Sequence, residues 1–383
     1  MTPIITHRRL RLPDCCGSVV GTAATLAASA GAVNGAATGG RTVAPELFAV
    51  RVAAAVRGAL CGSSCPVRAM PPRGMLGHLW TIGPNLRHRL APRVAPPSEP
   101  WSTTLHDPKI GDVRLTGALA RVPEARGLVV LVHGLGGALD SQYLVKAARA
   151  AADAGLDSLR LALRGADRAG EDFYHAGLVE DLQAALRSPA LADYRTIFVI
   201  GFSLGGHMVL RWALAPSDPR VRAVASVCAP LDLAAGCAAI DRPGAGLYRS
   251  HVLSGLREIY AAVAARRPVP TPVTVVAGIR TIREWDRLVV VPRHGFCSVD
   301  DYYDSQSAAP RLRGLELPTL IVAATGDPMV PAATVAPALR ELPRHVIARW
   351  APGGHVGFAG GVDLGLGDRP GLERQIFAWM LRQ

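Results

Sequence analysis

Apolar and polar residues follow several distinct patterns after about residue 100, and each pattern predicts an element. Two short extended segments, 101–105 and 112–120, flank a turn containing Pro and Gly and predict an antiparallel strand pair at a sheet edge. Continuous apolar runs bounded by Gly or Pro predict strands buried on both faces, because such strands have no polar side. These runs occupy residues 127–133, 158–163, 196–201, 221–227, 319–324 and 345–350.

Segments with apolar residues at helical spacing lie between these strands, at 141–154, 178–186, 204–213 and 372–381. Alternating strands and helices predict an α/β fold with a mostly parallel, doubly wound sheet, since right-handed crossovers place helices on both faces. The alternation stops at about 231–313, a region richer in Arg and aromatic residues. We therefore expect one α/β domain at 68–383 that carries an inserted helical cap.

The charge of the chain is unevenly distributed. The 383 residues are 49% hydrophobic, which suits a substantial core, and the formal net charge is +12. The first 100 residues hold 11 Arg or Lys against 3 Asp or Glu, whereas residues 101–383 hold 31 against 27. Because the basic excess lies mainly outside the predicted domain, we expect no nucleic-acid partner for that domain.

Residues 1–67 are predicted to form a basic, Ala- and Gly-rich extension. The uncharged stretch at 16–40 has few strongly apolar side chains, so we expect no membrane-spanning helix and at most peripheral membrane contact. Three alternatives remain for this extension: a disordered segment, a twin-arginine export signal around Arg8 and Arg9, or upstream sequence with the true start at Met70 or Met75.

The cysteines favour a reducing compartment. Four of the seven lie in the N-terminal extension, and Cys228, Cys237 and Cys297 are too scattered for a disulfide framework or a zinc site. We therefore expect a cytoplasmic protein, with export through the N-terminal signal as the alternative.

The segment G-F-S-L-G at 201–205 matches the pattern G-x-S-x-G between a predicted strand and a predicted helix. A chain that turns sharply from strand to helix exposes the serine at the carboxyl edge of the sheet. Gly201 and Gly205 provide the missing side chains that such a turn requires. This placement predicts Ser203 as a catalytic nucleophile.

A serine hydroxyl needs a base, and this motif is followed by its partners in the order serine, acid, histidine. Asp327 comes directly after a buried strand, and His355 lies in a Gly-rich loop after the next one. We expect His355 to act as general base and then general acid, while Asp327 fixes its tautomer. Asp232 also follows a strand and is the rival acid.

Two backbone N–H groups are expected to hold the developing oxyanion. One is that of Leu204, immediately after the nucleophile at a helix N-terminus. The other comes from the loop H-G-L-G-G at 133–137, where we favour Leu135 with Gly136 as the alternative. His133 is expected to orient this loop.

No cofactor or metal is predicted. The glycines at 134–137 lack the order G-x-G-x-x-G, no phosphate-binding G-x-x-x-x-G-K-[ST] is present, and neither lysine follows a glycine. The eleven histidines are dispersed without an H-E-x-x-H motif. A small-molecule ester is therefore the expected partner.

Several motifs occur together in one order. They are G-H-L-W-T-I at 77–82, H-G-L-G-G at 133–137, L-R-G at 163–165, Y-H-A-G at 174–177, G-F-S-L-G-G at 201–206, T-I-R-E-W-D at 281–286, D-Y-Y at 301–303, D-P at 327–328 and G-G-H-V-G-F at 353–358. In this combination the chain resembles the AB hydrolase 4 family of YheT-like serine esterases, over about 300 of its 383 residues. The resemblance implies an α/β-hydrolase fold and relatives described as acylglycerol, phospholipid or short-chain ester hydrolases.

The chain departs from the family pattern in three places. Trp80 stands where Gln is common, Ala176 replaces a hydroxyl residue, and residues 1 to about 67 have no counterpart. The change at Ala176 leaves the roles of the neighbouring Tyr174 and His175 open.

The sequence thus predicts a serine hydrolase that cleaves carboxylic esters through an acyl-enzyme. Thioesterase, acyltransferase or peptidase activity on the same triad is an alternative within enzymes, and a non-catalytic binding protein is an alternative outside them. Apolar cap residues either line an acyl pocket or only bury the cap on the sheet. These residues are Leu247, Tyr248, Val252, Leu253, Ile259 and Tyr260.

Overall fold

The computed structural model describes residues 73–383. The chain divides into two units, Met1–Ser64 and Cys65–Gln383, and the described residues belong to the second. The predicted extension at 1–67, with its export-signal alternative, lies outside the described residues.

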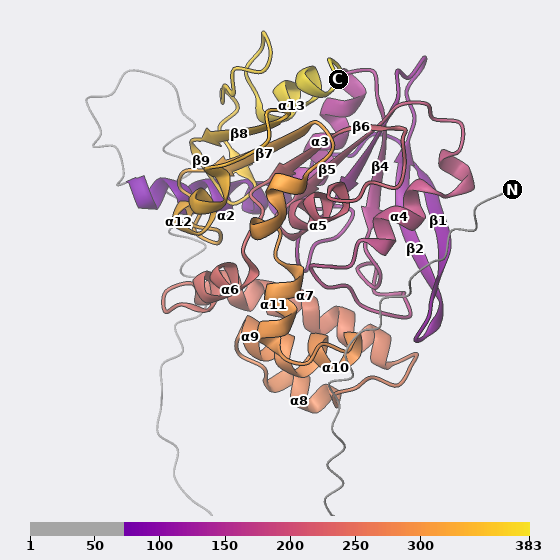
Figure 1. The fold of residues 1–383 in the computed structure, drawn as a ribbon, viewed down its shortest axis with the longest axis vertical. Helices are drawn as coiled ribbons and strands as arrows, with labels where there is room; N and C mark the ends of the chain where they lie inside the picture. The colour runs from indigo at the N-terminus through magenta and orange to yellow at the C-terminus, as the bar shows by residue number, and fades with distance from the viewer. Residues whose placement is uncertain (1–72) are drawn as a thin grey trace, which may run out of the picture. The chain divides into compact units, whose positions relative to one another are not determined.

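The described part of the chain is built on an eight-stranded sheet with the order β1-β2-β4-β3-β5-β6-β7-β8 (Figure 1). Its strands are β1 (Glu99–Asp107), β2 (Gly111–Ala120), β3 (Leu128–Val132), β4 (Asp157–Ala162), β5 (Ile197–Phe202), β6 (Val221–Val227), β7 (Thr319–Ala324) and β8 (Val346–Ala351). Strands β1 and β2 form an antiparallel hairpin that joins the sheet at β4, and the pairs from β4 to β8 are parallel. The predicted α/β fold with a mostly parallel sheet is confirmed.

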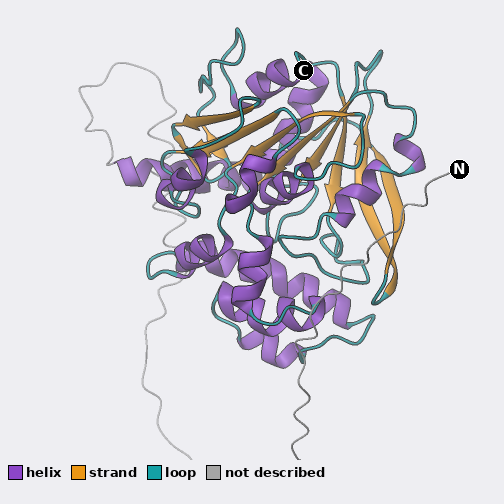
Figure 2. Ribbon diagram, viewed as in Figure 1, coloured by secondary structure: helices purple, strands orange, loops and turns teal. Residues whose placement is uncertain are grey.

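Helices cover both faces of the sheet, as Figure 2 shows. Along β3, Val129 and Leu131 face one core with α3 (Gln142–Asp153) and α13 (Leu372–Met380). The alternate residues of β3 face a second core with α4 (Glu180–Leu186) and α5 (Leu204–Ala213). Both faces are apolar, which explains why the parallel strands read as continuous hydrophobic runs.

The predicted helical cap is inserted between β6 and β7 and lies below the sheet in the view of Figure 1. It contains α6 (Leu233–Asp241), α7 (Gly246–Ala264), α8 (Val273–Gly278), α9 (Ile282–Trp285), the π-helical turn Asp286–Val290, α10 (Val291–His294) and α11 (Val299–Gln306). The ring nitrogens of His207 on α5 lie 2.6 Å from the carbonyl oxygen of Pro230 and 2.9 Å from that of Gln306. One side chain of α5 therefore contacts the chain where the cap begins and where it ends.

Among the features that were not predicted from the sequence, two pack against each other. They are α2 (Arg73–Leu90) and a small hairpin formed by β9 (Gly353–Gly354) and β10 (Gly357–Phe358). Helix α2 contains glycines and Pro84, which lower helix propensity. It packs against β9 and β10, and Figure 1 shows α2 beside β9. The remaining short helices are α12 (Ala332–Val335) and the 3₁₀ turns Pro189–Leu191, Ala309–Gly314 and Ala336–Leu339.

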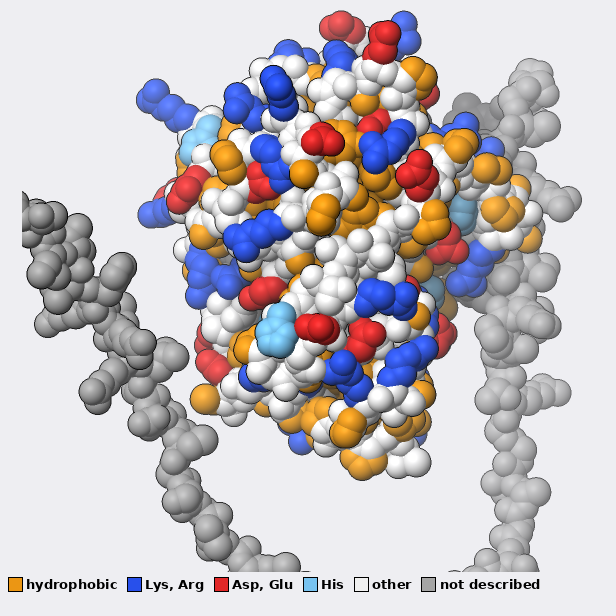
Figure 3. Space-filling view, turned by 90° about the vertical axis from the view of Figure 1, so that its right-hand side faces the viewer, with side chains coloured by type: hydrophobic (Ala, Val, Ile, Leu, Met, Phe, Trp, Pro, Cys, Tyr) orange, Lys and Arg blue, Asp and Glu red, His pale blue; other side chains and the backbone are white. Residues whose placement is uncertain are grey.

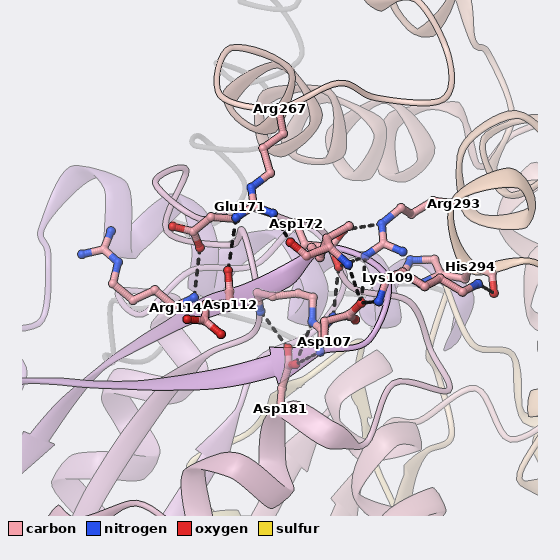
Figure 4. A network of polar contacts seen from close by, with 12 residues as sticks. Asp107, Lys109, Asp112, Arg114, Glu171, Asp172, Asp181, Arg267, Arg293 and His294 are labelled. Carbon is pink, nitrogen blue, oxygen red and sulfur yellow. Dashed lines mark hydrogen bonds and ion pairs between the residues drawn. The ribbon is translucent and has the colours of Figure 1, made fainter.

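A buried ion network joins the cap to the sheet. Arg164, at the end of β4, pairs with Asp181 at 2.7 Å, Asp107 at 2.9 Å and Asp172 at 3.0 Å. Arg293 of the cap also pairs with Asp172, at 2.7 Å. Figure 4 shows Asp107, Asp172 and Asp181 in this network, with Arg293 on the side of Asp172. Burial alone would lower the pKa of Arg164, but the charges of Asp181 and Asp172 outweigh burial and raise it.

Basic and acidic side chains are intermingled on the face drawn in Figure 3, as the balanced charge of residues 101–383 predicts. Within residues 73–383, none of the helices has the length and apolar character needed to cross a bilayer.

Candidate active site

Ser203 lies in the sharp turn between β5 and α5, with φ of 54° and ψ of −122°. A non-glycine residue with positive φ is uncommon and strained, so the surrounding chain must hold it. Added Cβ atoms would overlap backbone here: one on Gly201 would meet the carbonyl of Gly205, and one on Gly205 would meet the carbonyl of His133. The two glycines of the motif are therefore required by close backbone approach.

The structure brings Ser203, His355 and Asp327 together from three separate loops. The Nε2 atom of His355 lies 2.8 Å from Ser203 Oγ, and its Nδ1 atom lies 2.8 Å from Asp327 Oδ2. His355 and Asp327 are each only 6% exposed, whereas Ser203 is partly exposed. With Nδ1–H donating to the carboxylate, Nε2 is free to accept the serine proton.

The Asp327 carboxylate is held by its own loop. Its Oδ1 atom accepts hydrogen bonds from the backbone N–H groups of Met329 and Val330, both at 2.8 Å. This leaves Oδ2 directed at His355. The rival acid Asp232 instead caps α6, where its Oδ1 atom accepts a hydrogen bond from Ala235 N–H at 2.9 Å.

The glycine-rich loop after β3 passes directly beside the serine, since a Cβ on Gly134 would lie 2.9 Å from Ser203 Cβ. Two amides of this loop donate to tyrosine hydroxyls: Gly134 N–H donates to Tyr143 at 3.0 Å, and Gly136 N–H donates to Tyr174 at 2.8 Å. The alternative oxyanion donor, Gly136, is therefore already engaged.

The amides of Leu135 and Leu204, which the sequence predicts as oxyanion donors, donate to no protein acceptor among residues 73–383. Gly137 N–H donates to the Gly134 carbonyl at 3.0 Å, which leaves Leu135 as the loop amide without a protein acceptor. Leu204 is the first residue of α5, where an N–H group has no acceptor within its own helix. Their role as oxyanion donors stays a prediction.

His133 is completely buried beneath this loop. Its Nδ1 atom lies 2.7 Å from the Gly134 carbonyl oxygen, and Nε2 accepts a hydrogen bond from Leu163 N–H at 3.2 Å. Burial lowers the pKa of His133 to about 4, so the ring is neutral and carries its proton on Nδ1. These contacts fit the expected orienting role.

Tyr174 and His175, whose roles the sequence left open, face different parts of the molecule. Tyr174 contacts the glycine-rich loop, as described above. His175 packs against His294 of the cap with ring centroids 4.3 Å apart. Burial, with a contribution from Arg164, lowers the pKa of His175 to about 3. His175 therefore belongs to the buried contact between cap and sheet, away from the triad.

The sequence reasoning assigned no hydrogen-bonding role to three residues close to Asp327 and His355, although it named one of them, Tyr248, as a cap residue. Tyr248 of α7 bonds to His78 of α2 at 2.6 Å, and burial together with the Asp327 charge raises the pKa of Tyr248 to about 12. Thr81 of α2 accepts a hydrogen bond from His355 N–H at 2.8 Å. Thr81 and His78 belong to the motif at 77–82, so this motif could have drawn attention to them. Its position in the sequence, however, gives no indication that it contacts the loop near residue 355.

Residues 73–383 contain no group of three or more His, Cys, Asp or Glu side chains placed to hold a metal ion. Cys228 is buried close to Asp327. Burial, with a contribution from the Asp327 charge, raises the pKa of its thiol far above the usual range. The thiol is therefore protonated and a poor nucleophile or metal ligand.

Comparison with known proteins agrees with this fold. A model of the alpha/beta hydrolase family matches residues 129–360. The chain is 32% identical over 262 residues to the Escherichia coli K12 protein named "Putative esterase YheT", a match covering 66% of this chain and 76% of YheT. It is 26% identical over 172 residues to a Saccharomyces cerevisiae monoacylglycerol lipase, covering 43% of this chain and 38% of the lipase.

Among solved structures, a 2,6-dihydroxy-pseudo-oxynicotine hydrolase is 18% identical with a TM-score of 0.46, covering 79% of this chain and 72% of that one. The family match defines the class, and the chain belongs to the alpha/beta hydrolase family. Within that family, its resemblance to YheT-like esterases is confirmed. The relatives named as esterase and lipase support the prediction of a carboxylic ester hydrolase.

Proposed function

We propose that this protein is a serine hydrolase that cleaves carboxylic esters through a covalent acyl-enzyme. The observation that carries the proposal is the continuous hydrogen-bonded chain from Ser203 Oγ through His355 to Asp327, with 2.8 Å at each step. Nucleophile, base and orienting acid are the three groups that acyl transfer by a serine needs.

In the acylation step, Ser203 Oγ attacks the ester carbonyl while His355 Nε2 accepts the hydroxyl proton. Asp327 stabilises the imidazolium that forms. The N–H groups of Leu204 and Leu135 donate to the tetrahedral oxyanion, and each such donor contributes about 3 kcal/mol to lowering the barrier. The intermediate collapses when the C–O bond breaks and His355 returns the proton to the leaving alcohol.

Deacylation repeats the sequence with water as nucleophile. His355 takes a proton from water, hydroxide adds to the acyl carbonyl, and the same two amides hold the second oxyanion. Collapse of that intermediate breaks the bond to Ser203 Oγ, His355 returns the proton to that oxygen, and the acid is released.

The proposed substrates are esters with an apolar, medium-chain or acylglycerol-like acyl group. Helix α7 crosses the glycine-rich loop closely, since a Cβ on Gly136 would lie 3.3 Å from the Val252 carbonyl oxygen. Tyr248 and Val252 of this helix are buried near the triad, whereas Tyr260 bonds to Thr271 inside the cap. The cap residues near Tyr248 thus support an apolar acyl site, and the lipase relative points in the same direction.

The test compares wild type with Ser203→Ala, using a fluorophosphonate probe and a chain-length series of p-nitrophenyl esters. Wild type is expected to label and to favour medium chains, whereas Ser203→Ala should not label and should lose at least about 10³-fold in kcat. Equal hydrolysis by the two proteins would contradict the proposal. Faster turnover of acyl thioesters than of matched oxygen esters would favour the thioesterase alternative.

The acid is tested by Asp327→Asn with Asp232→Asn as its matched control. Asp327→Asn should lower kcat by roughly 10³- to 10⁴-fold, because the amide no longer holds the productive histidine tautomer. Asp232→Asn should keep wild-type kcat, since Asn caps a helix about as well as Asp. The opposite pattern would make Asp232 the acid.

A further inference from the structure

His355 lies at the tip of the β9–β10 hairpin, in a turn that is strained. Its neighbour Val356 has φ of 49°, a conformation that β-branched residues almost never adopt. Such a backbone persists only where surrounding structure holds it in place. The position of the imidazole therefore depends on whatever packs against this hairpin.

Helix α2 provides that support through one buried hydroxyl. Thr81 is 5% exposed, and its Oγ1 atom accepts a hydrogen bond from His355 N–H at 2.8 Å. The same hydroxyl donates to the Gly77 carbonyl at 2.8 Å, which fixes the direction of its lone pairs. Thr81 thus satisfies a buried backbone donor at the catalytic histidine.

Helix α2 also lies so close to the loops that carry His355 and Asp327 that the contact positions have no room for a Cβ atom. Added Cβ atoms on Gly354 and Gly357 would overlap the carbonyl oxygens of Gly77 and Trp80 on α2. A Cβ on Gly77 would overlap the carbonyl of Gly326, next to Asp327. One end of α2 therefore touches the loops of both the base and the acid.

We propose that Thr81 is a positioning residue for His355, and that α2 keeps the imidazole within reach of Ser203. The proposal rests on the triad function above. Thr81 touches the backbone of His355 and not the reacting atoms, so its loss should misplace the base without changing how substrate binds. Misplacement of a catalytic group by about 1 Å costs up to about 10²-fold in rate.

The experiment compares Thr81→Val, Thr81→Ser and Thr319→Val in the full chain. Valine keeps the shape of threonine but lacks the hydroxyl, whereas serine keeps it. Thr319 is a matched control: it is 0% exposed and its hydroxyl donates to a backbone carbonyl, that of Leu317 at 2.8 Å, at the start of β7. The measurements are kcat, KM, the rate of fluorophosphonate labelling and the thermal midpoint Tm.

Thr81→Val is expected to lower kcat and the labelling rate by about 10- to 100-fold with KM within about twofold. Thr81→Ser should recover most of the kcat, and Thr319→Val should lower Tm without lowering kcat. The proposal is overturned if Thr81→Val keeps wild-type kcat, if serine rescues no better than valine, or if Thr319→Val loses as much kcat. Ser203→Ala is measured in parallel: full activity there would refute the triad itself, whereas an inactive Ser203→Ala beside a fully active Thr81→Val would refute only the role of Thr81.

Discussion

The hydroxyl of Tyr174 accepts the hydrogen bond of Gly136 N–H, and its oxygen lies 3.4 Å from the Gly134 carbonyl. Both contacts bridge the loop that carries Leu135. A neutral hydroxyl is needed for this, and burial raises the pKa of Tyr174, which keeps it protonated. At the scale of single residues, therefore, one phenol engages the amide of Gly136, whereas that of Leu135 keeps no protein acceptor.

Replacing Tyr174 with Phe should lower kcat about tenfold, because Gly136 N–H loses its acceptor and the loop loses its fixed shape. Steady-state kinetics on a p-nitrophenyl ester measure the effect. Tyr194→Phe is the control, since that hydroxyl bonds to Asp157 at the start of β4, at the amino end of the parallel strands. If the two variants lost kcat equally, the loss would reflect general destabilisation rather than the oxyanion loop.

At the scale of elements, α5 contacts both ends of the cap insertion. His207 follows Ser203 by one helical turn, and its ring contacts carbonyl oxygens at both ends of the cap insertion. The helix that presents Ser203 and the chain segments that support the cap are therefore tied through one imidazole. Helix α2 makes a comparable link on the other side of the site, through His78 and Tyr248.

Replacing His207 with Phe should destabilise the protein by about 2 kcal/mol, because the carbonyl oxygen that accepts the ring N–H loses its partner in a buried site. Urea unfolding measures this change. His345→Phe is the control: its imidazole makes one contact, 2.8 Å from the Leu315 carbonyl oxygen, from an exposed position, and should cost less than about 1 kcal/mol. An equal loss of unfolding free energy in the two variants would show that the contacts of His207 do not stabilise the cap.

At the scale of the whole molecule, buried titratable groups set how stability depends on pH. Burial lowers the pKa of His133 and of His207 to about 4 and that of His175 to about 3, and it lowers the pKa of His251 and of His294 as well. Between the unfolded value of about 6.5 and these folded values, the unfolded chain binds protons that the folded chain does not. The contribution of these neutral, buried histidines to stability is therefore complete above about pH 6.5 and is lost as the pH falls toward 4.

Asp286 acts in the opposite direction, because burial raises its pKa to about 7 and the folded state binds a proton that the unfolded state has released. Five histidines outweigh one aspartate, so we expect Tm to be lower at about pH 4.5 than at about pH 7. Asp286→Asn removes the opposing group and should make this dependence steeper. Thermal unfolding across this pH range measures both, and a higher Tm at the acid end would contradict the assignment of neutral buried histidines.

The family motifs and the order of strands were sufficient to predict the sheet and the three residues that the structure brings together. Ser203, Asp327 and His355 each follow a predicted buried strand, and parallel strands end at one edge of a sheet. Local constraints therefore carry that information: glycines where backbone must approach, apolar runs where strands are covered, and a fixed order of motifs along the chain.

The support of the site was decided only by tertiary structure. Thr81 meets His355 across 274 positions of the chain, and α2 has glycines and a proline that argue against a helix until it packs on the β9–β10 hairpin. Tyr174 was visible in its motif, but no period or spacing indicates that its hydroxyl reaches Gly136. Periodicity reports which side of an element is buried; the partner of a buried hydroxyl depends on how distant segments come together.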